Sequence, residues 1–471
     1  MISDLAPIKF GTDGWRAVIA REYTFANLER VAQAYADHLL QSNASPSVVI
    51  GYDRRFLSEL FAARAAEVLA GNGAHVSLFA EAVPTPLISW AVKELKADGG
   101  VVITASHNPA DFNGFKIKAP WGGSAAPETT RAVEELVDAQ PAKRANVSIE
   151  PDTANLASAV ESYRQQIASC VDLERLRAAH GTVIVDPMHG SGGNWVESFL
   201  SGGELKVETI RGYRDPLFGG VNPEPIDSNL GALKTRVCET KSVVGLATDG
   251  DADRVGAVNE RGETMNMHQV VPLVLLHLVR ERKTTGGIVR TFSQSVLLKR
   301  IAAAFNLPIH ETPIGFKYIA DLMLKDDILI GAEESGGIGV KGHIPERDGI
   351  LNSLLFLEAI VTAGVTPSEM LAALHREFGE FHFGRKDLHV QPGPGQQLVE
   401  DLARNPPTQL AGYSVTGVET MDGTKLLFDD ESWLLFRQSG TEPVLRIYSE
   451  ATSVEKMQAL VSAGKNLAHS V

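Results

Sequence analysis

The stretch Val101-Val102-Ile103-Thr104-Ala105-Ser106-His107-Asn108-Pro109 joins a continuous apolar run to a polar loop. The same pattern occurs elsewhere in the chain, and each run ends abruptly in polar or glycine-rich sequence. These further runs are Val48–Ile50, Val183–Val185, Val243–Leu246, Ile288–Val289 and Ile328–Ile330. Continuous rather than alternating apolar character is typical of strands buried on both faces, as in parallel sheets.

Amphipathic stretches lie between these runs and predict helices over Leu28–Leu40, Glu59–Ala70 and Leu351–Ala363. Alternation of strands and helices indicates an α/β fold. Because the runs pair up within domain-sized segments, we predict three similar α/β domains with mixed, mostly parallel sheets. The sequence after about Arg385 has short strands and a terminal helix, which indicates a smaller C-terminal α+β domain. The predicted domains are residues 1–146, 147–260, 261–378 and 379–471.

Composition narrows the class of function. The chain has 471 residues and a net charge of −14, which argues against a nucleic-acid partner because phosphate backbones attract basic surfaces. No run approaches the roughly 20 apolar residues that span a bilayer, and residues 1–10 lack the pattern of a secretory signal. The two cysteines, Cys170 and Cys238, match no metal or redox spacing. We therefore expect a cytoplasmic protein without a membrane partner.

The loop after Val101–Ile103 contains a candidate nucleophile. Ser106 stands between a buried strand and a turn that ends at Pro109, which predicts a stiff, exposed corner. An isolated Ser-His pair is more often a simple turn, but residues 104–109 followed closely by Asn113-Gly114-Phe115-Lys116 form a more specific pattern. Since adjacent side chains point apart, the pattern does not require a hydrogen bond between Ser106 and His107.

A second loop, Asp249-Gly250-Asp251-Ala252-Asp253-Arg254, carries three carboxylates at alternate positions. In an extended loop they would project to one side, and without a cation their repulsion would be costly. Oxygen ligands suit Mg²⁺. A calcium-binding EF-hand also fits Asp249, Asp251, Asp253 and Glu260, but Arg254 occupies the position that requires glycine, and a strand rather than a helix precedes the loop. A solvated acidic turn without metal is the remaining alternative.

Three further segments carry polar groups suited to a sugar phosphate. Carboxylates and a hydroxyl in residues 331–337 suit hydrogen bonding to sugar hydroxyls. Residues 437–443 combine arginine, hydroxyls and glycine, which together suit a phosphate. Residues 10–16 form a glycine-flanked turn that could aim Arg16 inward. Taken alone, residues 331–337 are a weak signal and residues 10–16 predict a hairpin turn, whereas the full run of polar residues at 437–443 favours a phosphate site over a surface turn.

In this order, the five segments resemble the motifs of the α-D-phosphohexomutase superfamily, and the resemblance extends from Gly11 to Arg446. It implies four domains around a central cleft. It also implies a phosphoserine loop, a metal loop, a sugar-binding loop and a phosphate-binding loop at residues 104–109, 249–254, 333–335 and 437–441.

The resemblance assigns roles to individual residues. The expected catalytic residues are Ser106, Lys116, Arg16, His107 and Arg347. The expected Mg²⁺ ligands are Ser106, Asp249, Asp251 and Asp253, with Arg254 near the metal. The expected substrate-binding residues are Thr312, Gly315, Glu333, Ser335, His343, Arg437, Ser439, Gly440, Thr441 and Arg446.

The sequence does not decide which of several cationic side chains acts as the general base. Arginine is a poor proton acceptor, so we favour Lys116 as the base and Arg347 as an electrostatic clamp. Some members of the superfamily place a histidine where this chain has Gly337. The segment around Arg347 and the Glu333-Glu334-Ser335 loop are instead similar to the glucose-preferring branch.

The implied activity is the interconversion of glucose 1-phosphate and glucose 6-phosphate through a phosphoserine and glucose 1,6-bisphosphate. The expected partners are therefore a hexose phosphate and a hexose 1,6-bisphosphate, and the chain is expected to be a monomer or a dimer. Phosphomannomutase and phosphoglucosamine mutase are alternatives. A glucose 1,6-bisphosphate synthase would release the intermediate, whose retention we assign to a hinge at residues 378–384. A phosphatase and a non-catalytic sugar-phosphate sensor complete the alternatives.

Overall fold

The computed structural model describes residues 7–11, 13–390, 392–439 and 444–469. The chain divides into two compact units. Unit 1 comprises Met1–Met265 and Gly336–Pro367, and unit 2 comprises Asn266–Ser335 and Ser368–Val471.

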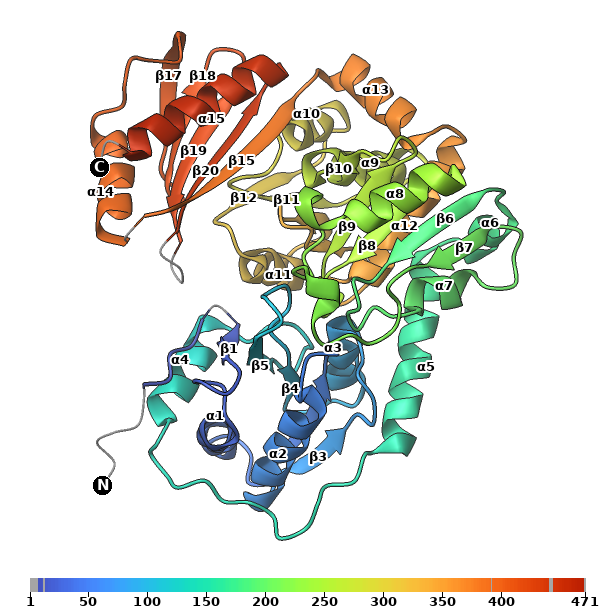
Figure 1. Cartoon of the computed structure of the whole chain (residues 1–471), viewed down its shortest axis with the longest axis vertical. Coiled ribbons are helices and arrows are strands. Elements are labelled where there is room, and N and C mark those ends of the chain that lie inside the picture. The colour runs from blue at the N-terminus through green and yellow to red at the C-terminus, as the bar shows by residue number, and fades with distance from the viewer. Residues whose placement is uncertain (1–6, 12, 391, 440–443, 470–471) are drawn as a thin grey trace. The chain divides into compact units, whose positions relative to one another are not determined.

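The first sheet of unit 1 has the strand order β1-β5-β4-β2-β3. Strands β2, β3 and β4 are parallel, whereas β5 is antiparallel to both β4 and β1. Helices α1 and α2 pack against each other, and α1 also packs on α4 (Figure 1). The elements are β1 (Gly14–Val18), α1 (Phe25–Leu40), β2 (Ser47–Tyr52), α2 (Ser58–Gly71), β3 (His75–Leu78), α3 (Thr85–Glu94), β4 (Gly99–Ile103), β5 (Phe112–Lys118) and α4 (Pro127–Leu136).

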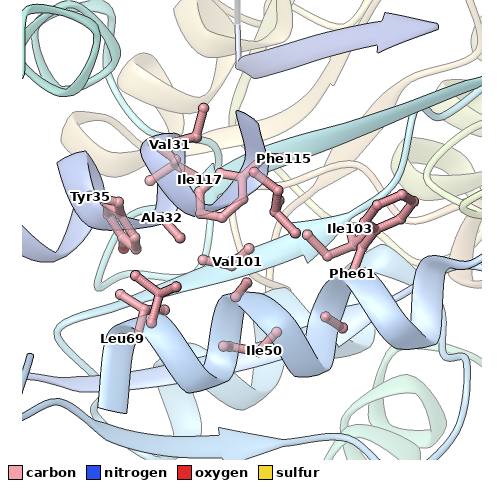
Figure 2. Packing of buried hydrophobic residues seen from close by; sticks show 14 of the residues in the cluster. Val31, Ala32, Tyr35, Ile50, Phe61, Leu69, Val101, Ile103, Phe115 and Ile117 are labelled. Carbon is pink, nitrogen blue, oxygen red and sulfur yellow. The ribbon is translucent and has the colours of Figure 1, made fainter. Parts of the chain in front are cut away.

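A continuous hydrophobic core fixes the position of β4 in this sheet. Figure 2 shows side chains of α1 and α2 meeting those of β2, β4 and β5. Val101 and Ile103 of β4 are completely buried, as the uninterrupted apolar run predicts. The labelled members of the core are Val31, Ala32, Tyr35, Ile50, Phe61, Leu69, Val101, Ile103, Phe115 and Ile117. Since β4 is held on both faces, the loop that follows it begins from a rigid base.

The second sheet of unit 1 repeats this arrangement. Its order is β10-β9-β8-β6-β7, so β7-β6-β8-β9 corresponds to β3-β2-β4-β5 of the first sheet. Strands β6, β7 and β8 are parallel, and β9 is antiparallel to β8. The elements are α5 (Thr153–Cys170), α6 (Leu173–Ala178), β6 (Thr182–Asp186), α7 (Trp195–Leu200), β7 (Lys206–Thr209), α8 (Gly231–Thr240), β8 (Val244–Thr248), β9 (Val255–Asn259) and β10 (Thr264–Met265), with short 3₁₀ turns at Phe218–Gly220 and Asp227–Asn229.

Unit 1 ends with β14 (Ile338–Val340) and α12 (Gly349–Ala363). Helix α12 begins at Asp348, whose carboxylate caps the backbone N–H groups of Ile350 and Leu351. The helix packs on β8 and β9 and is buried along most of its length. No single helix in the described ranges is long and apolar enough to cross a membrane, and the bent pair of α12 with α13 (Pro367–Phe378) passes only by length and composition.

Unit 2 contains a third parallel arrangement. Strand β11 pairs in parallel with both β12 and β13. Helix α9 begins with a capping box in which Asn266 and Gln269 satisfy each other's backbone groups. The elements are α9 (Met267–Arg280), β11 (Gly287–Thr291), α10 (Val296–Ala304), β12 (Ile309–Thr312), α11 (Phe316–Lys325), β13 (Ile328–Ala332) and α13 (Pro367–Phe378).

The rest of unit 2 is an antiparallel sheet of order β15-β20-β19-β18-β17-β16. Helix α15 packs across β15 and β20 (Figure 1). The elements are β15 (His382–His389), α14 (Pro392–Arg404), β16 (Gln409–Leu410), β17 (Tyr413–Glu419), β18 (Thr424–Phe428), β19 (Trp433–Gln438), β20 (Val444–Ala451) and α15 (Val454–His469). The predicted α/β class with a C-terminal α+β domain is confirmed, while the exact domain boundaries stay a prediction.

Candidate active site

Ser106 lies directly after β4, in the left-handed backbone region with a φ of 53°. Its N–H donates to the hydroxyl of Thr104 at 2.8 Å. Its own hydroxyl lies 3.0 Å from Asp249 Oδ2, to which it donates, and 3.2 Å from His107 Nδ1. The left-handed turn brings neighbouring side chains together, so Ser106 and His107 do interact.

The predicted exposed corner is instead buried, because the Asp249–Arg254 loop covers it. Only 1% of Ser106 is exposed. A Cβ at Gly250 would lie 2.4 Å from the carbonyl oxygen of Ser106, so this close approach requires glycine. Burial, together with Arg254 and Arg16, lowers the pKa of His107 well below its usual value, which keeps the imidazole neutral.

The three aspartates follow β8, at the position in the second sheet that Ser106 occupies in the first. Asp249, Asp251 and Asp253 are completely buried, and one carboxylate oxygen of each lies within 4.8 Å of the others. The loop is a tight turn rather than the expected extended segment. Ala252 has a φ of 60°, and this turn makes the carboxylates converge. Strand β8 precedes the loop where an EF-hand would need a helix, so that alternative is wrong.

The carboxylates fit a small divalent cation. Burial, and after it Asp251 and Asp253, raises the pKa of Asp249 well above its ordinary value. Among the described residues, Asp251 Oδ1 and Asp253 Oδ1 are buried and find no hydrogen-bond donor. Oxygen acceptors with free lone pairs in a buried triad are the donor set that Mg²⁺ prefers.

Cationic side chains surround the triad. Lys116 Nζ on β5 lies 2.8 Å from Asp251 Oδ2 and 3.3 Å from Asp253 Oδ2. Arg347 Nη2 lies 3.0 Å from Asp253 Oδ2. Although burial opposes it, the aspartates raise the pKa of Lys116 above its ordinary value. This direction is opposite to the one a general base needs, so the assignment of Lys116 as the base stays a prediction, and its geometry favours an electrostatic role.

Two more predicted residues contact the same loops. Arg16 donates to Asn108 Oδ1 at 2.8 Å and to the Ala105 carbonyl at 3.4 Å. The backbone N–H of Arg254 donates to Asp249 Oδ1 at 3.0 Å, and its guanidinium lies 3.7 Å from Glu224.

Some residues of the site were not predicted. The hydroxyl of Thr85, at the start of α3, donates to Asp251 Oδ2 at 2.8 Å. Asp13 lies 3.7 Å from Lys116 Nζ and 3.4 Å from Arg16. Asp13 stands inside the glycine-flanked turn that drew attention to Arg16, so proximity in sequence was an available signal. Thr85 follows a proline at an ordinary helix start and offered none.

His343 does not join this cluster. Its Nε2 lies 3.1 Å from Asp348 Oδ2, and its ring stacks on Trp90 with centroids 5.8 Å apart. Tyr163 donates to the same Asp348 oxygen at 2.7 Å. His343 is therefore placed in the packing around the start of α12, and its predicted contact with substrate has no support from this position.

In unit 2, the Glu333–Ser335 loop follows β13, again after the third strand of a parallel set. Glu333 is buried, and Glu334 accepts a hydrogen bond from Ser293 at 2.7 Å. Burial, and after it the carboxylate of Glu334, raises the pKa of Tyr448 to about 12. The Glu333–Ser335 loop and β20 therefore share one electrostatic environment.

Two arginines face each other across neighbouring strands of the C-terminal sheet. Arg437 on β19 pairs in register with Arg446 on β20. Directly opposed like charges repel, and acidic residues offset them: Arg437 Nε lies 2.9 Å from Asp422, and Arg446 Nε lies 3.7 Å from Asp387. Such a pair of guanidinium groups suits a phosphate.

The remaining predicted substrate residues are spread over unit 2. Thr312 ends β12 and is buried, and Gly315 precedes α11 with a φ of 139°. The N–H of Ser439 donates to the carbonyl of Val444 at 2.9 Å. Gly440 and Thr441 lie outside the described residues.

A buried serine beside convergent carboxylates, with cationic side chains around both, is the set of groups that an enzyme uses to transfer phosphoryl groups. Comparison with known proteins identifies the family of this chain. Sequence models of phosphoglucomutase/phosphomannomutase match residues 7–144 (alpha/beta/alpha domain I), 161–262 (domain II), 266–378 (domain III) and 396–463 (C-terminal domain).

Individual relatives span nearly the whole chain. A phosphoglucomutase/phosphomannomutase of Thermococcus kodakarensis is 32% identical, over 97% of this chain and 98% of its own. A phosphoglucosamine/phosphogalactosamine mutase of Sulfurisphaera tokodaii is 29% identical over the same shares. A crystal structure from Thermus thermophilus, provisionally described as a phosphomannomutase, is 40% identical with a TM-score of 0.87 and covers 98% of this chain and 99% of its own. The chain belongs to the phosphoglucomutase/phosphomannomutase family, within the phosphohexomutase superfamily.

Proposed function

We propose that this chain is a phosphohexomutase that moves a phosphoryl group between the 1- and 6-positions of a hexose, using Ser106 as the carrier. The observation that carries the proposal is the 3.0 Å contact between the Ser106 hydroxyl and Asp249, inside a buried triad of carboxylates. Three buried carboxylates in one place repel one another, and a bound cation beside the serine would offset that cost.

We assign Asp249, Asp251 and Asp253 to Mg²⁺. When bound, the ion would supply positive charge to the oxygens of the transferring phosphoryl group, which is the principal requirement of this chemistry. Lys116 and Arg347 add positive charge from the protein's own side chains.

The transfer step balances as an exchange of oxygens on phosphorus. A sugar hydroxyl oxygen forms the new P–O bond while the bond between phosphorus and Ser106 Oγ breaks. The proton lost by the sugar hydroxyl is matched by the proton that Ser106 gains. The bisphosphate then returns its other phosphate to Ser106 by the same exchange in reverse. Unit 1 residues perform the transfer, and Glu333, Ser335, Arg437 and Arg446 of unit 2 recognise sugar and phosphate.

One experiment separates the mutase from its alternatives. Phosphorylated protein is mixed with glucose 6-phosphate, and the solution is assayed for glucose 1-phosphate, free bisphosphate and inorganic phosphate. Isomer without accumulating bisphosphate supports the mutase. Stoichiometric free bisphosphate with little isomer contradicts it and indicates the synthase, and excess inorganic phosphate indicates the phosphatase.

The sugar preference is the second part of the proposal. The sequence predicts a preference for glucose, but the names of the relatives support mannose or glucosamine phosphates better. We therefore propose that the chain accepts mannose phosphate as well as glucose phosphate. We expect kcat/KM values for these two within about tenfold of each other, equivalent to about 1.4 kcal/mol, because the two sugars differ at one hydroxyl other than the 3- and 4-hydroxyls that we assign to Glu333 and Ser335.

The measurement is kcat/KM for the 1-phosphates of glucose, mannose and glucosamine under one condition. A value for glucosamine phosphate exceeding both others would replace this proposal with a phosphoglucosamine mutase. A value for glucose phosphate more than a hundredfold above that for mannose phosphate would restore the glucose-preferring prediction.

A further prediction concerns the phosphate-binding arginine. We expect Arg437→Ala to raise KM by about tenfold or more, because the substrate loses a charge-assisted contact in both its ground and transition states. A smaller loss in kcat follows if that contact also orients the reacting hydroxyl. Steady-state kinetics in both directions measure the two effects. Arg404→Ala, on the exposed face of α14, is the matched control and should leave both constants unchanged. Unaltered KM in Arg437→Ala would place the phosphate elsewhere.

A further inference from the structure

One arginine, Arg55, donates hydrogen bonds to several backbone carbonyl groups around Ser106. The side chain of Arg55 is completely buried. Its Nη2 donates to the carbonyl oxygens of Ser106 at 2.7 Å and Asn108 at 2.6 Å, and its Nη1 donates to those of Pro109 at 2.7 Å and Phe112 at 3.1 Å. Four carbonyl groups of one loop thus converge on a single guanidinium.

The position of the Arg55 side chain is itself fixed by Asp53. Arg55 Nε lies 3.1 Å from Asp53 Oδ2, and the same carboxylate oxygen accepts from the Thr104 hydroxyl at 2.6 Å. Asp53 Oδ1 accepts from the Ser58 hydroxyl at 2.9 Å. The Thr104 hydroxyl oxygen accepts a hydrogen bond from the Ser106 N–H. The network therefore contacts both the backbone N–H and the backbone carbonyl of Ser106.

This network stabilises a conformation that Ser106 does not favour. The left-handed backbone of Ser106 is strained for a residue that carries a Cβ. Four convergent carbonyl dipoles also repel one another unless a cation lies between them. The planar, five-donor guanidinium meets that need, whereas an ammonium has three donors around one point.

We propose that Arg55 is a positioning residue for the transfer: it holds residues 104–112 so that Ser106 Oγ faces Asp249 and His107. The proposal rests on the proposed function for its kinetic consequence, and on the contacts alone for its structural one. Asp53 and Thr104 act through Arg55 and through the Ser106 N–H. The function of the network is to set the direction of one oxygen, since a displacement of about 1 Å in a reacting atom costs about a hundredfold in rate.

The test is Arg55→Lys, which keeps the positive charge and removes the planar, five-donor guanidinium. We expect kcat to fall at least tenfold while KM for the sugar phosphate changes less than threefold, because unit 2 residues that recognise the substrate are untouched. Hydrogen–deuterium exchange should quicken in the peptide covering residues 104–112. Arg30→Lys is the matched control: Arg30 makes a two-pronged ion pair with Asp138, at 2.7 and 2.6 Å, and its loss should alter neither kcat nor exchange at residues 104–112.

Wild-type-like kcat together with unchanged exchange in Arg55→Lys would overturn the proposal. Quickened exchange with unchanged kcat would also overturn it, because the loop would then be loosened without consequence. If the wild type shows no mutase activity, the proposed function fails, and the exchange result still decides whether Arg55 holds the loop.

A second pair of variants covers a failure of Arg55→Lys to fold. Thr104→Val removes the hydroxyl that joins Asp53 to the Ser106 N–H at nearly constant volume, and Thr104→Ser restores it. We expect kcat to fall at least fivefold in the valine variant and to return to within twofold of wild type in the serine variant. Equal kcat in the two variants would overturn the proposal.

Discussion

Replacement of Ser106 by alanine should abolish mutase turnover and leave the purified protein without the phosphate that we expect on Ser106. The loss removes the only atom that accepts and returns the phosphoryl group in the proposed mechanism, so we expect kcat to fall on the order of 10⁴-fold or more, as for other covalent nucleophiles. Folding should survive, because the hydroxyl contributes hydrogen bonds to Asp249 and His107 rather than packing.

Intact-protein mass and peptide mapping locate the phosphate, and circular dichroism with thermal unfolding checks the fold. Ser89→Ala is a matched control. Ser89 is also a completely buried serine of unit 1, and its hydroxyl has no hydrogen-bond partner among the described residues, so its removal should change neither phosphate content nor turnover. Substantial activity in Ser106→Ala would show that the phosphoserine mechanism is wrong.

The fold was predictable because its strands are buried on both faces. Runs such as Val101–Ile103 and Ile328–Ile330 leave no alternating pattern, and in the structure each run lies in a strand that pairs in parallel with a neighbour. The helix predicted at Leu28 begins three residues earlier, at Phe25, because Thr24 caps the N–H of Asn27. Local capping extends a helix beyond its amphipathic pattern, and the sequence contains that signal in Thr24.

The site was only partly predictable, since its chemistry depends on contacts between distant segments. The aspartates were identified by their spacing, but the turn at Ala252 that gathers them was not. The burial of Ser106 depends on Gly250, 144 residues away in the sequence, and no local pattern reports that approach. Arg55 stands in Asp53-Arg54-Arg55, which reads as an ordinary polar loop, and only the convergence of four carbonyl groups reveals its position.

His343 stays a predicted substrate-binding residue, but its contacts in the structure are packing contacts. A histidine among glycine, proline and charged residues suggests a ligand in the sequence, yet the ring packs between Trp90 and Asp348. Aromatic stacking and a buried carboxylate are tertiary contacts, so a polar residue that stabilises the start of a helix has the same local signature as one that binds substrate.

The second large effect is expected from Asp251→Asn. The variant keeps the shape of the side chain, and Thr85 can still donate to its remaining oxygen. It removes one of three negative charges from the proposed Mg²⁺ site, so we expect the Mg²⁺ concentration for half-maximal activity to rise at least tenfold. At saturating Mg²⁺, kcat should still fall about a hundredfold, equivalent to about 2.7 kcal/mol of activation barrier. The reason is that the charge of the ligand set and the position of Lys116 both change.

Stability distinguishes this electrostatic effect from simple damage to the fold. Without metal, the three buried carboxylates repel one another, and the cationic side chains of Lys116, Arg254 and Arg347 offset part of that repulsion. Removing the charge of Asp251 relieves repulsion but weakens the ion pair with Lys116, which keeps its contact with Asp253 at 3.3 Å. Because the two effects oppose each other, the metal-free variant should unfold near the wild-type temperature. Mg²⁺ at a hundred times its dissociation constant adds about 2.7 kcal/mol to the wild type, and this gain should shrink in the variant.

Thermal unfolding with and without Mg²⁺, combined with titration calorimetry, measures both quantities without reference to activity. Asp98→Asn is the control, since Asp98 lies just before β4, at the end of the strand opposite Ser106, and accepts from Ser47. Its variant should keep the full stabilisation by Mg²⁺. Exhaustive chelation should inactivate the wild type reversibly. An Asp251→Asn variant that gains as much stability from Mg²⁺ as the wild type would remove Asp251 from the metal site, and activity that survives chelation would remove the metal from the mechanism.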